Sequence, residues 1–199
     1  IVNIIIDKVA PLPPTLFQLS LNGFINSLPS VLNWSESTDP GVLASGLNNY
    51  SIYKGSVSGS LWLLATTPAT TRTYNDSVLS EGSRSFYGVS ATDRASNIGD
   101  RSNEESVVLD TVKPVTTLTK TPAIPNGTNG WYKTPFGVTL ACADSVSGCL
   151  SDSTKVSVNG ATPTVYTGTL LVDKEGTNTI SYFSTDNAGN IEATKTLEE

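Results

Sequence analysis

The chain has 199 residues, a net charge of −6 and no histidine. Histidine is the commonest general base and zinc ligand, so its absence removes the agents of the usual Ser-His-Asp, Cys-His and zinc hydrolases. Charged residues make up 15% of the chain, whereas Ser and Thr number 25 and 26, which predicts a surface rich in hydroxyl groups. The acidic balance also argues against nucleic acid as a partner, because phosphate backbones are bound by clustered Lys and Arg.

The first residues, Ile1 to Ile6, form a mostly apolar run of strand length. The run is too short to cross a bilayer and no basic residue precedes it, so neither membrane insertion nor a signal peptide is predicted. Because the chain starts without Met, we expect a piece cut from a longer precursor. An isolated starting strand also suits self-assembly, in which Ile1 to Ile6 adds a strand to a neighbouring copy.

Two phrases occur twice in the chain. An apolar-Asp-x-Val-x-Pro phrase stands at 6–11 and 109–114, where it joins a strand end to a stiff Pro segment and marks a linker. A Thr-Asp-x-Ala-x-Asn-Ile phrase stands at 92–98 and 185–191. This period of about one small domain indicates tandem repeats. The predicted parts are the last strand or linker of a preceding unit (1–10), one complete unit (11–110) and a second unit (111–199).

Both units have the pattern of β-strands. Short runs of apolar or β-branched residues recur about every 8–12 residues between Gly, Pro, Asn and Asp, the spacing of β-sandwiches. Asn159-Gly160 predicts a hairpin turn. Ser102 to Glu105 resembles a helix-capping box, but too few residues follow for a stable helix, so a strand is predicted up to Leu109. The fold class is therefore all-β, with two tandem antiparallel β-sandwiches. The other predicted strands are 30–34, 50–54, 86–91, 137–141, 155–158, 168–172 and 178–183.

The first unit resembles a bacterial fibronectin type III module. The resemblance rests on Leu32-Asn33-Trp34 on strand B, Tyr50 to Gly55 on strand C, Tyr74-Asn75-Asp76 on strand E and Tyr87 to Asp93 on strand F. The second unit is similar to the immunoglobulin-like repeats of bacterial surface proteins, through residues 130–135, 142–149 and 181–190. It departs from a standard immunoglobulin domain, because its two Cys are too close in sequence to join opposite sheets. Both resemblances imply spacers, adhesin stalks or accessory modules.

The three Trp residues have different expected settings. Trp34 alternates with Leu32 on a predicted strand, which places it in the core. Trp62 lies in the apolar run 61–64, in which one alternate pair of residues faces the core and the other faces solvent, and the pattern does not decide which. It is the best candidate for a surface contact. Trp131 follows Asn129-Gly130 and is expected to close the bottom of the second sandwich; a binding role is the alternative.

The two Cys, Cys142 and Cys149, admit a disulfide, free thiols or part of a metal site. Without His or further Cys the usual tetrahedral zinc set cannot be completed, so a disulfide is predicted. Asp144 and Gly148 are expected to shape the loop between the two Cys. Such a bridge persists only in an oxidising compartment, which predicts an extracellular, cell-surface or periplasmic setting.

Acidic residues recur at matching positions of the two units. In a sandwich whose neighbouring strands alternate in direction, the B–C and F–G loops return to the pole beside the incoming linker. Carboxylate and amide oxygens that meet there suit Ca²⁺; the alternative is that Asp93 and Asp186 only close Asx turns and the linker Asp face water. No other cofactor is predicted. The predicted Ca²⁺ ligands are Asp7, Asp39, Asp93 and Asn97 in the first set, and Asp110, Asp144, Asp186 and Asn190 in the second.

Only carboxylates remain as acid or base groups, and Glu36, Asp39 and Asp93 are the ones expected near each other. Asp in such loops mostly caps turns, so no catalytic residue and no enzymatic activity are predicted. We expect a structural, spacer or adhesion segment of a larger secreted or cell-surface prokaryotic protein. One alternative is a carbohydrate-binding accessory module of a polysaccharide-degrading enzyme, and another is a strand-complemented extracellular filament subunit. The expected partners are neighbouring domains of the same polypeptide and a protein or glycan ligand.

Overall fold

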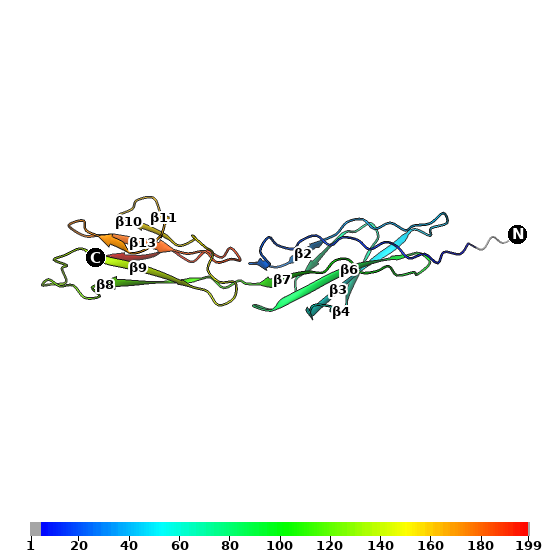
Figure 1. Cartoon of the computed structure of the whole chain (residues 1–199), viewed down its shortest axis with the longest axis horizontal. Coiled ribbons are helices and arrows are strands. Elements are labelled where there is room, and N and C mark those ends of the chain that lie inside the picture. The colour runs from blue at the N-terminus through cyan, green and yellow to red at the C-terminus, as the bar shows by residue number, and fades with distance from the viewer. Residues whose placement is uncertain (1–4, 199) are drawn as a thin grey trace. The chain divides into compact units, whose positions relative to one another are not determined.

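The computed structural model describes residues 5–198, and the regular elements within this range are all β-strands (Figure 1). The predicted all-β fold class is therefore confirmed. The chain divides into two compact units, Ile1–Asp110 and Thr111–Glu199, each with its own hydrophobic core. No helix in the described range could span a bilayer. Most of the predicted self-assembly strand, residues 1–4, lies outside the described residues, and Ile5 and Ile6 are exposed and belong to no strand.

The first unit is built from two sheets. The larger has the strand order β1-β7-β6-β3-β4, and the smaller pairs β2 with β5. The long strands β3 and β6 form the middle of the larger sheet (Figure 1). The predicted strand up to Leu109 is confirmed as β7. The strands are β1 (Phe24–Ile25), β2 (Ser30–Asn33), β3 (Leu47–Val57), β4 (Ser60–Pro68), β5 (Thr73–Asp76), β6 (Arg84–Asp93) and β7 (Glu105–Leu109).

One strand pair corrects the prediction of purely antiparallel sheets. β1 runs parallel to β7, with Phe24 opposite Val108. The segment before β1 first bridges antiparallel to the small sheet, Leu16 opposite Trp34. The chain then crosses to the edge of the larger sheet without reversing its direction, and there it lies parallel to β7.

Side-chain alternation along the strands builds the core of the first unit. Trp34 is 2% exposed and packs edge-to-face against Tyr50, with ring centroids 5.6 Å apart. The predicted place of Trp34 in the core is confirmed. Because successive residues of a strand point to opposite faces, the core takes every second residue of β3 and β6. The buried set is Leu16, Leu32, Trp34, Tyr50, Ile52, Tyr87, Val89, Ala91 and Val107.

The second unit also has two sheets, of order β12-β9-β8 and β11-β10-β13-β14. The predicted turn at Asn159-Gly160 is confirmed, since both residues have positive φ, 52° and 73°, and Ala161 N–H donates to the Val158 carbonyl. The strands are β8 (Val115–Thr121), β9 (Phe136–Ala143), β10 (Lys155–Val158), β11 (Thr164–Val165), β12 (Leu170–Val172), β13 (Thr179–Phe183) and β14 (Lys195–Glu198). The buried core is Phe136, Val138, Leu140, Val156, Val172, Ile180 and Tyr182.

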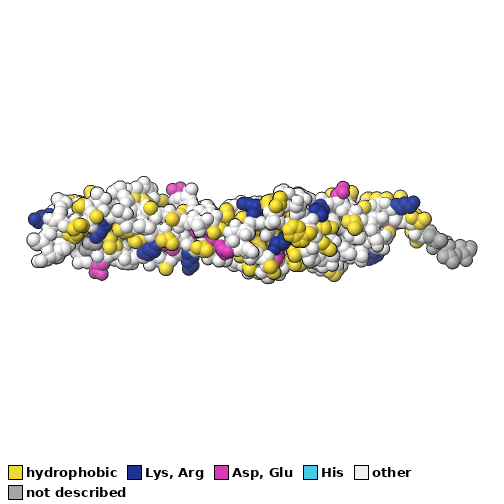
Figure 2. Space-filling view, turned by 90° about the horizontal axis from the view of Figure 1, so that it is seen from below, with side chains coloured by type: hydrophobic (Ala, Val, Ile, Leu, Met, Phe, Trp, Pro, Cys, Tyr) yellow, Lys and Arg dark blue, Asp and Glu magenta, His cyan; other side chains and the backbone are white. Residues whose placement is uncertain are grey.

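The surface carries few charges. On the face seen in Figure 2, uncharged polar side chains and backbone predominate, and Lys, Arg, Asp and Glu are scattered. This agrees with the predicted hydroxyl-rich surface. Acidic groups gather instead in loops at the ends of strands, where the candidate site lies.

Candidate metal centres

Three carboxylates from distant parts of the sequence meet at one pole of the first unit. Asp7 lies in the N-terminal segment, Asp39 in the loop between β2 and β3, and Asp93 at the end of β6. Each offers an oxygen within 4.8 Å of those offered by the other two. Within residues 5–198, none of the three forms an ion pair with Lys or Arg. Because like charges this close repel one another, the arrangement favours a bound cation.

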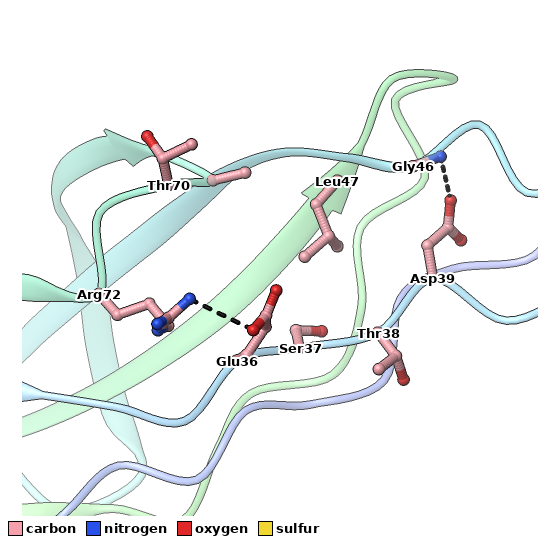
Figure 3. A pocket seen from close by; sticks show the side chains of 9 residues that line it. Glu36, Ser37, Thr38, Asp39, Gly46, Leu47, Thr70 and Arg72 are labelled. Carbon is pink, nitrogen blue, oxygen red and sulfur yellow. Dashed lines mark hydrogen bonds and ion pairs between the residues drawn. The ribbon is translucent and has the colours of Figure 1, made fainter.

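Asp39 is the member of this group whose hydrogen bonding is incomplete. Its Oδ2 accepts a hydrogen bond of 2.6 Å from the N–H of Gly46, whose φ of 81° favours glycine. Its Oδ1 is buried and has no hydrogen-bond partner. Figure 3 shows Asp39 at the edge of an open pocket, with one oxygen joined to Gly46. A buried carboxylate oxygen without a partner is costly, and a cation would satisfy it.

Asp7 and Asp93 are held by backbone groups and by one amide side chain. Asp7 accepts hydrogen bonds from the N–H groups of Ser45 and Val9, at 2.7 and 3.1 Å, and these bonds lower its pKa. Asp93 is fully buried and accepts from the backbone N–H and side-chain Nδ2 of Asn97, at 2.8 and 2.7 Å. Asn97 Nδ2 also donates to the Asp7 carbonyl at 3.2 Å. Asn97 therefore holds the carboxylate of Asp93 and the backbone of Asp7.

The second unit repeats this local geometry. Asp144 Oδ1 accepts from the three N–H groups of residues 146–148, at 3.1, 3.0 and 2.7 Å, while its Oδ2 is buried and has no hydrogen-bond partner. Asp186 is fully buried and accepts from the backbone N–H and Nδ2 of Asn190, both at 2.8 Å. Asn190 Nδ2 donates to the Val112 carbonyl at 3.2 Å. Asp186 and Asn190 thus repeat the two hydrogen bonds between Asp93 and Asn97.

The loops that carry Asp144 and Asp186 lie against each other within the second unit. Cys149 forms a β-bridge with Asp186, and Asn187 Nδ2 donates to the Ser147 carbonyl at 2.8 Å. The predicted disulfide between Cys142 and Cys149 is confirmed, and it closes the loop around Asp144.

Asp110 is fully buried and ends the first unit, where its N–H donates to the Ile25 carbonyl at 2.9 Å. Its place in the second ligand set stays a prediction.

The donor atoms suit a hard cation. They are carboxylate oxygens, and Ca²⁺ takes six to eight oxygen ligands. The Asx-turn alternative does account for Asp93 and Asp186, which accept the N–H four residues later. It does not account for the unpartnered oxygens of Asp39 and Asp144. Those two atoms distinguish the sites from ordinary turns.

Each unit also contains a buried carboxylate paired with a lysine, which the sequence analysis missed. Asp76 is 2% exposed and contacts Lys54 Nζ at 2.6 Å and the Tyr87 hydroxyl at 2.7 Å. Glu192 is 7% exposed and contacts Lys195 Nζ at 2.9 Å. Strand alternation could have indicated Asp76, because it faces the same side as the half-buried Tyr74. No comparable signal marks Glu192.

The remaining candidate residues are not members of the carboxylate groups described above. Glu36 forms an exposed ion pair with Arg72 at 3.4 Å, at the same pocket that Asp39 borders (Figure 3). Trp62 is 60% exposed on β4, and its role as a surface contact stays a prediction. The prediction that Trp131 closes the second sandwich is wrong, because it is 63% exposed. Phe136, with Tyr132 stacked on it at 4.5 Å, fills that place instead.

No protein-family model and no curated protein matches the chain. Among solved structures, the fibronectin(III)-like modules of Clostridium thermocellum CbhA match with a TM-score of 0.51 and 12% identity, over 93% of this chain and 92% of that chain. The chain has a fibronectin III-like fold. The FN1–FN3 domains of chicken CNTN1 match with a TM-score of 0.42 and 12% identity, over 94% and 66% of the two chains.

A β-1,2-glucanase from Parabacteroides distasonis matches over 53% of this chain, with a TM-score of 0.41 and 19% identity. The match covers 14% of the length of the glucanase.

Proposed function

We propose that this chain is a non-catalytic structural segment of a larger secreted or cell-surface protein, and that its units bind Ca²⁺ at their acidic poles. In this proposal the second unit is an immunoglobulin-like repeat of the kind found in bacterial surface proteins. The observation that carries the calcium assignment is the buried, unpartnered Oδ1 of Asp39 beside Asp7 and Asp93. The disulfide supports an oxidising compartment.

The acidic pole is poorly suited to catalysis. A general acid needs a carboxyl whose pKa is raised, whereas hydrogen bonds from Ser45 and Val9 lower the pKa of Asp7. Each oxygen of Asp93 accepts one hydrogen bond from Asn97, which fixes the carboxylate and leaves a second lone pair on each oxygen. Asp7 is thus held in its ionised form and Asp93 is held in place by Asn97, which suits a structural cation.

Bound Ca²⁺ would tie three separate segments of the first unit together. Asp7 would anchor the N-terminal segment, Asp39 the loop between β2 and β3, and Asp93 the end of β6. The ion would also offset the mutual repulsion of the three carboxylates. This would make a spacer stiffer, because the N-terminal segment that carries Asp7 would be held against the first unit.

Calorimetric titration of the chelator-treated chain with Ca²⁺ tests the proposal. We expect measurable heat, and a free Ca²⁺ concentration of about 100 times Kd should stabilise the first unit by about 2.7 kcal/mol, or roughly 10 °C in Tm. Asp39→Asn should abolish the response of the first unit.

Asp100→Asn is the matched control, since Asp100 is exposed and outside the three-carboxylate group, and it should titrate like the unaltered chain. Absence of both heat and a Tm shift at millimolar Ca²⁺ would overturn the calcium assignment and leave these residues as turn formers.

A further inference from the structure

The second unit carries a groove that the calcium proposal does not use. It lies between two loops, residues 129–136 and 172–178, and has a volume of about 850 Å³. Trp131 lines it and is 63% exposed. A large aromatic side chain left in water beside a concave surface is typical of a ligand site, because its burial on binding is favourable.

Hydrogen bonds fix the backbone that carries Trp131. Gly127 N–H donates to the Trp131 carbonyl at 2.7 Å, and Trp131 N–H donates to the Thr128 carbonyl at 3.2 Å. A Cβ at Gly127 would lie 2.5 Å from that Trp131 carbonyl oxygen, so the turn requires glycine. Lys133 N–H and Asn126 Oδ1 close the loop at 2.7 Å. The loop that carries the ring is therefore preformed, which reduces the entropy cost of binding.

The neighbouring aromatic residues are already occupied within the unit. Tyr132 stacks on Phe136 with centroids 4.5 Å apart, and its hydroxyl donates to the Pro122 carbonyl at 3.3 Å. Lys120 Nζ lies 5.6 Å from the centroid of the Tyr132 ring. Trp131 is thus the aromatic residue of this groove that remains open to a ligand.

The charges around the groove balance. The lining contains two lysines, Lys133 and Lys174, and two acidic residues, Asp173 and Glu175, and all four are exposed. The lining also includes the buried Val172. A groove of zero net charge gives no attraction to a charged polymer. Carboxylates, amides and hydroxyls around an indole ring match a ligand that has apolar C–H faces and many hydroxyl groups.

We propose that this groove binds a neutral glycan chain, with one sugar ring stacked on Trp131 and its hydroxyl groups bonded by the polar rim. The site lies wholly within the second unit and is independent of Ca²⁺. It gives the chain a binding role in addition to its structural one.

Affinity electrophoresis of the full chain tests this inference. The gels contain hydroxyethylcellulose, arabinoxylan, galactomannan or laminarin as neutral probes, and polygalacturonate as the charged one. We expect retardation by at least one neutral probe and none by polygalacturonate. Trp131→Ala should weaken binding at least about tenfold, as the loss of a central aromatic anchor does, whereas Trp131→Phe should retain most of it.

Trp62→Ala is the matched control, because Trp62 is exposed to a similar degree but lies in the first unit, and it should bind like the unaltered chain. Melting curves should show that Trp131→Ala remains folded. The inference is overturned if no neutral probe retards the unaltered chain, if polygalacturonate alone does so, or if Trp131→Phe and Trp131→Ala bind as well as the unaltered chain.

Discussion

The buried carboxylate of Asp76 is stabilised by a hydrogen-bond network inside the first unit. Burial alone raises the pKa of Asp76, but hydrogen bonds from Lys54, Tyr87 and Val78 and the charge of Lys54 outweigh it, so the pKa lies below its ordinary value of 3.8. Burial and the adjacent Asp76 raise the pKa of Tyr87. The tyrosine thus stays protonated and donates to the carboxylate. This network joins β3, β5 and β6 of the first unit.

Acid should weaken the first unit through Asp76. Since its folded pKa is lowered, the stability it contributes is fully present above its unfolded pKa of about 3.8 and is lost as the pH falls through the folded pKa. Asp76→Asn should flatten this acid dependence and cost about 3 kcal/mol at neutral pH, because Lys54 loses its negatively charged partner and keeps only the Val78 carbonyl. Urea unfolding monitored by the fluorescence of buried Trp34 measures both effects. An unchanged acid dependence in the variant would contradict the assignment.

The repeated Thr-Asp-x-Ala-x-Asn-Ile phrase explains why part of the metal centre could be predicted. Its Asp and Asn are four residues apart, so both Asp93 and Asp186 bond to an Asn within the same turn. The fifth position has positive φ in both copies, 70° at Ser96 and 90° at Gly189. Such local geometry is encoded in a few neighbouring residues.

Elements that depend on distant contacts were harder to predict. The parallel pairing of β1 with β7 needs a crossover between sheets, which no alternation pattern encodes. The exposure of Trp131 is of the same kind, because Phe136 enters the core with Tyr132 packed against it, and sequence alone does not rank three aromatic residues so close together.

The disulfide-closed loop should stabilise the second unit selectively. Closing the eight-residue loop from Cys142 to Cys149 contributes about 2.5 kcal/mol by the loop-entropy relation. Replacing both Cys by Ser should therefore lower the Tm of the second unit by roughly 10 °C or more, while the first unit is unaffected. Differential scanning calorimetry of the two proteins measures this. A variant that melts like the unaltered chain would show that the loop's hydrogen bonds, including those from residues 146–148 to Asp144, suffice without the bridge.

At the scale of the whole molecule, each unit holds its own core. The first is centred on Trp34 and Tyr50, and the second on Phe136 and Ile180. The boundary between the two units falls within the second copy of the repeated linker phrase, at Asp110. The Trp131 groove itself could not be predicted in the same way, since it combines two segments that are far apart in sequence.

Separate fragments should test how much each unit does alone. Fragment 1–110 contains a complete core together with Asp7, Asp39 and Asp93, so we expect it to unfold cooperatively and to show the Ca²⁺-dependent Tm shift of the first unit. Fragment 111–199 contains the second core, so we expect it to unfold cooperatively as well. Circular dichroism melts with and without chelator measure both. A fragment 1–110 that folds but ignores Ca²⁺, while the full chain responds, would show that the first set is not the binding site.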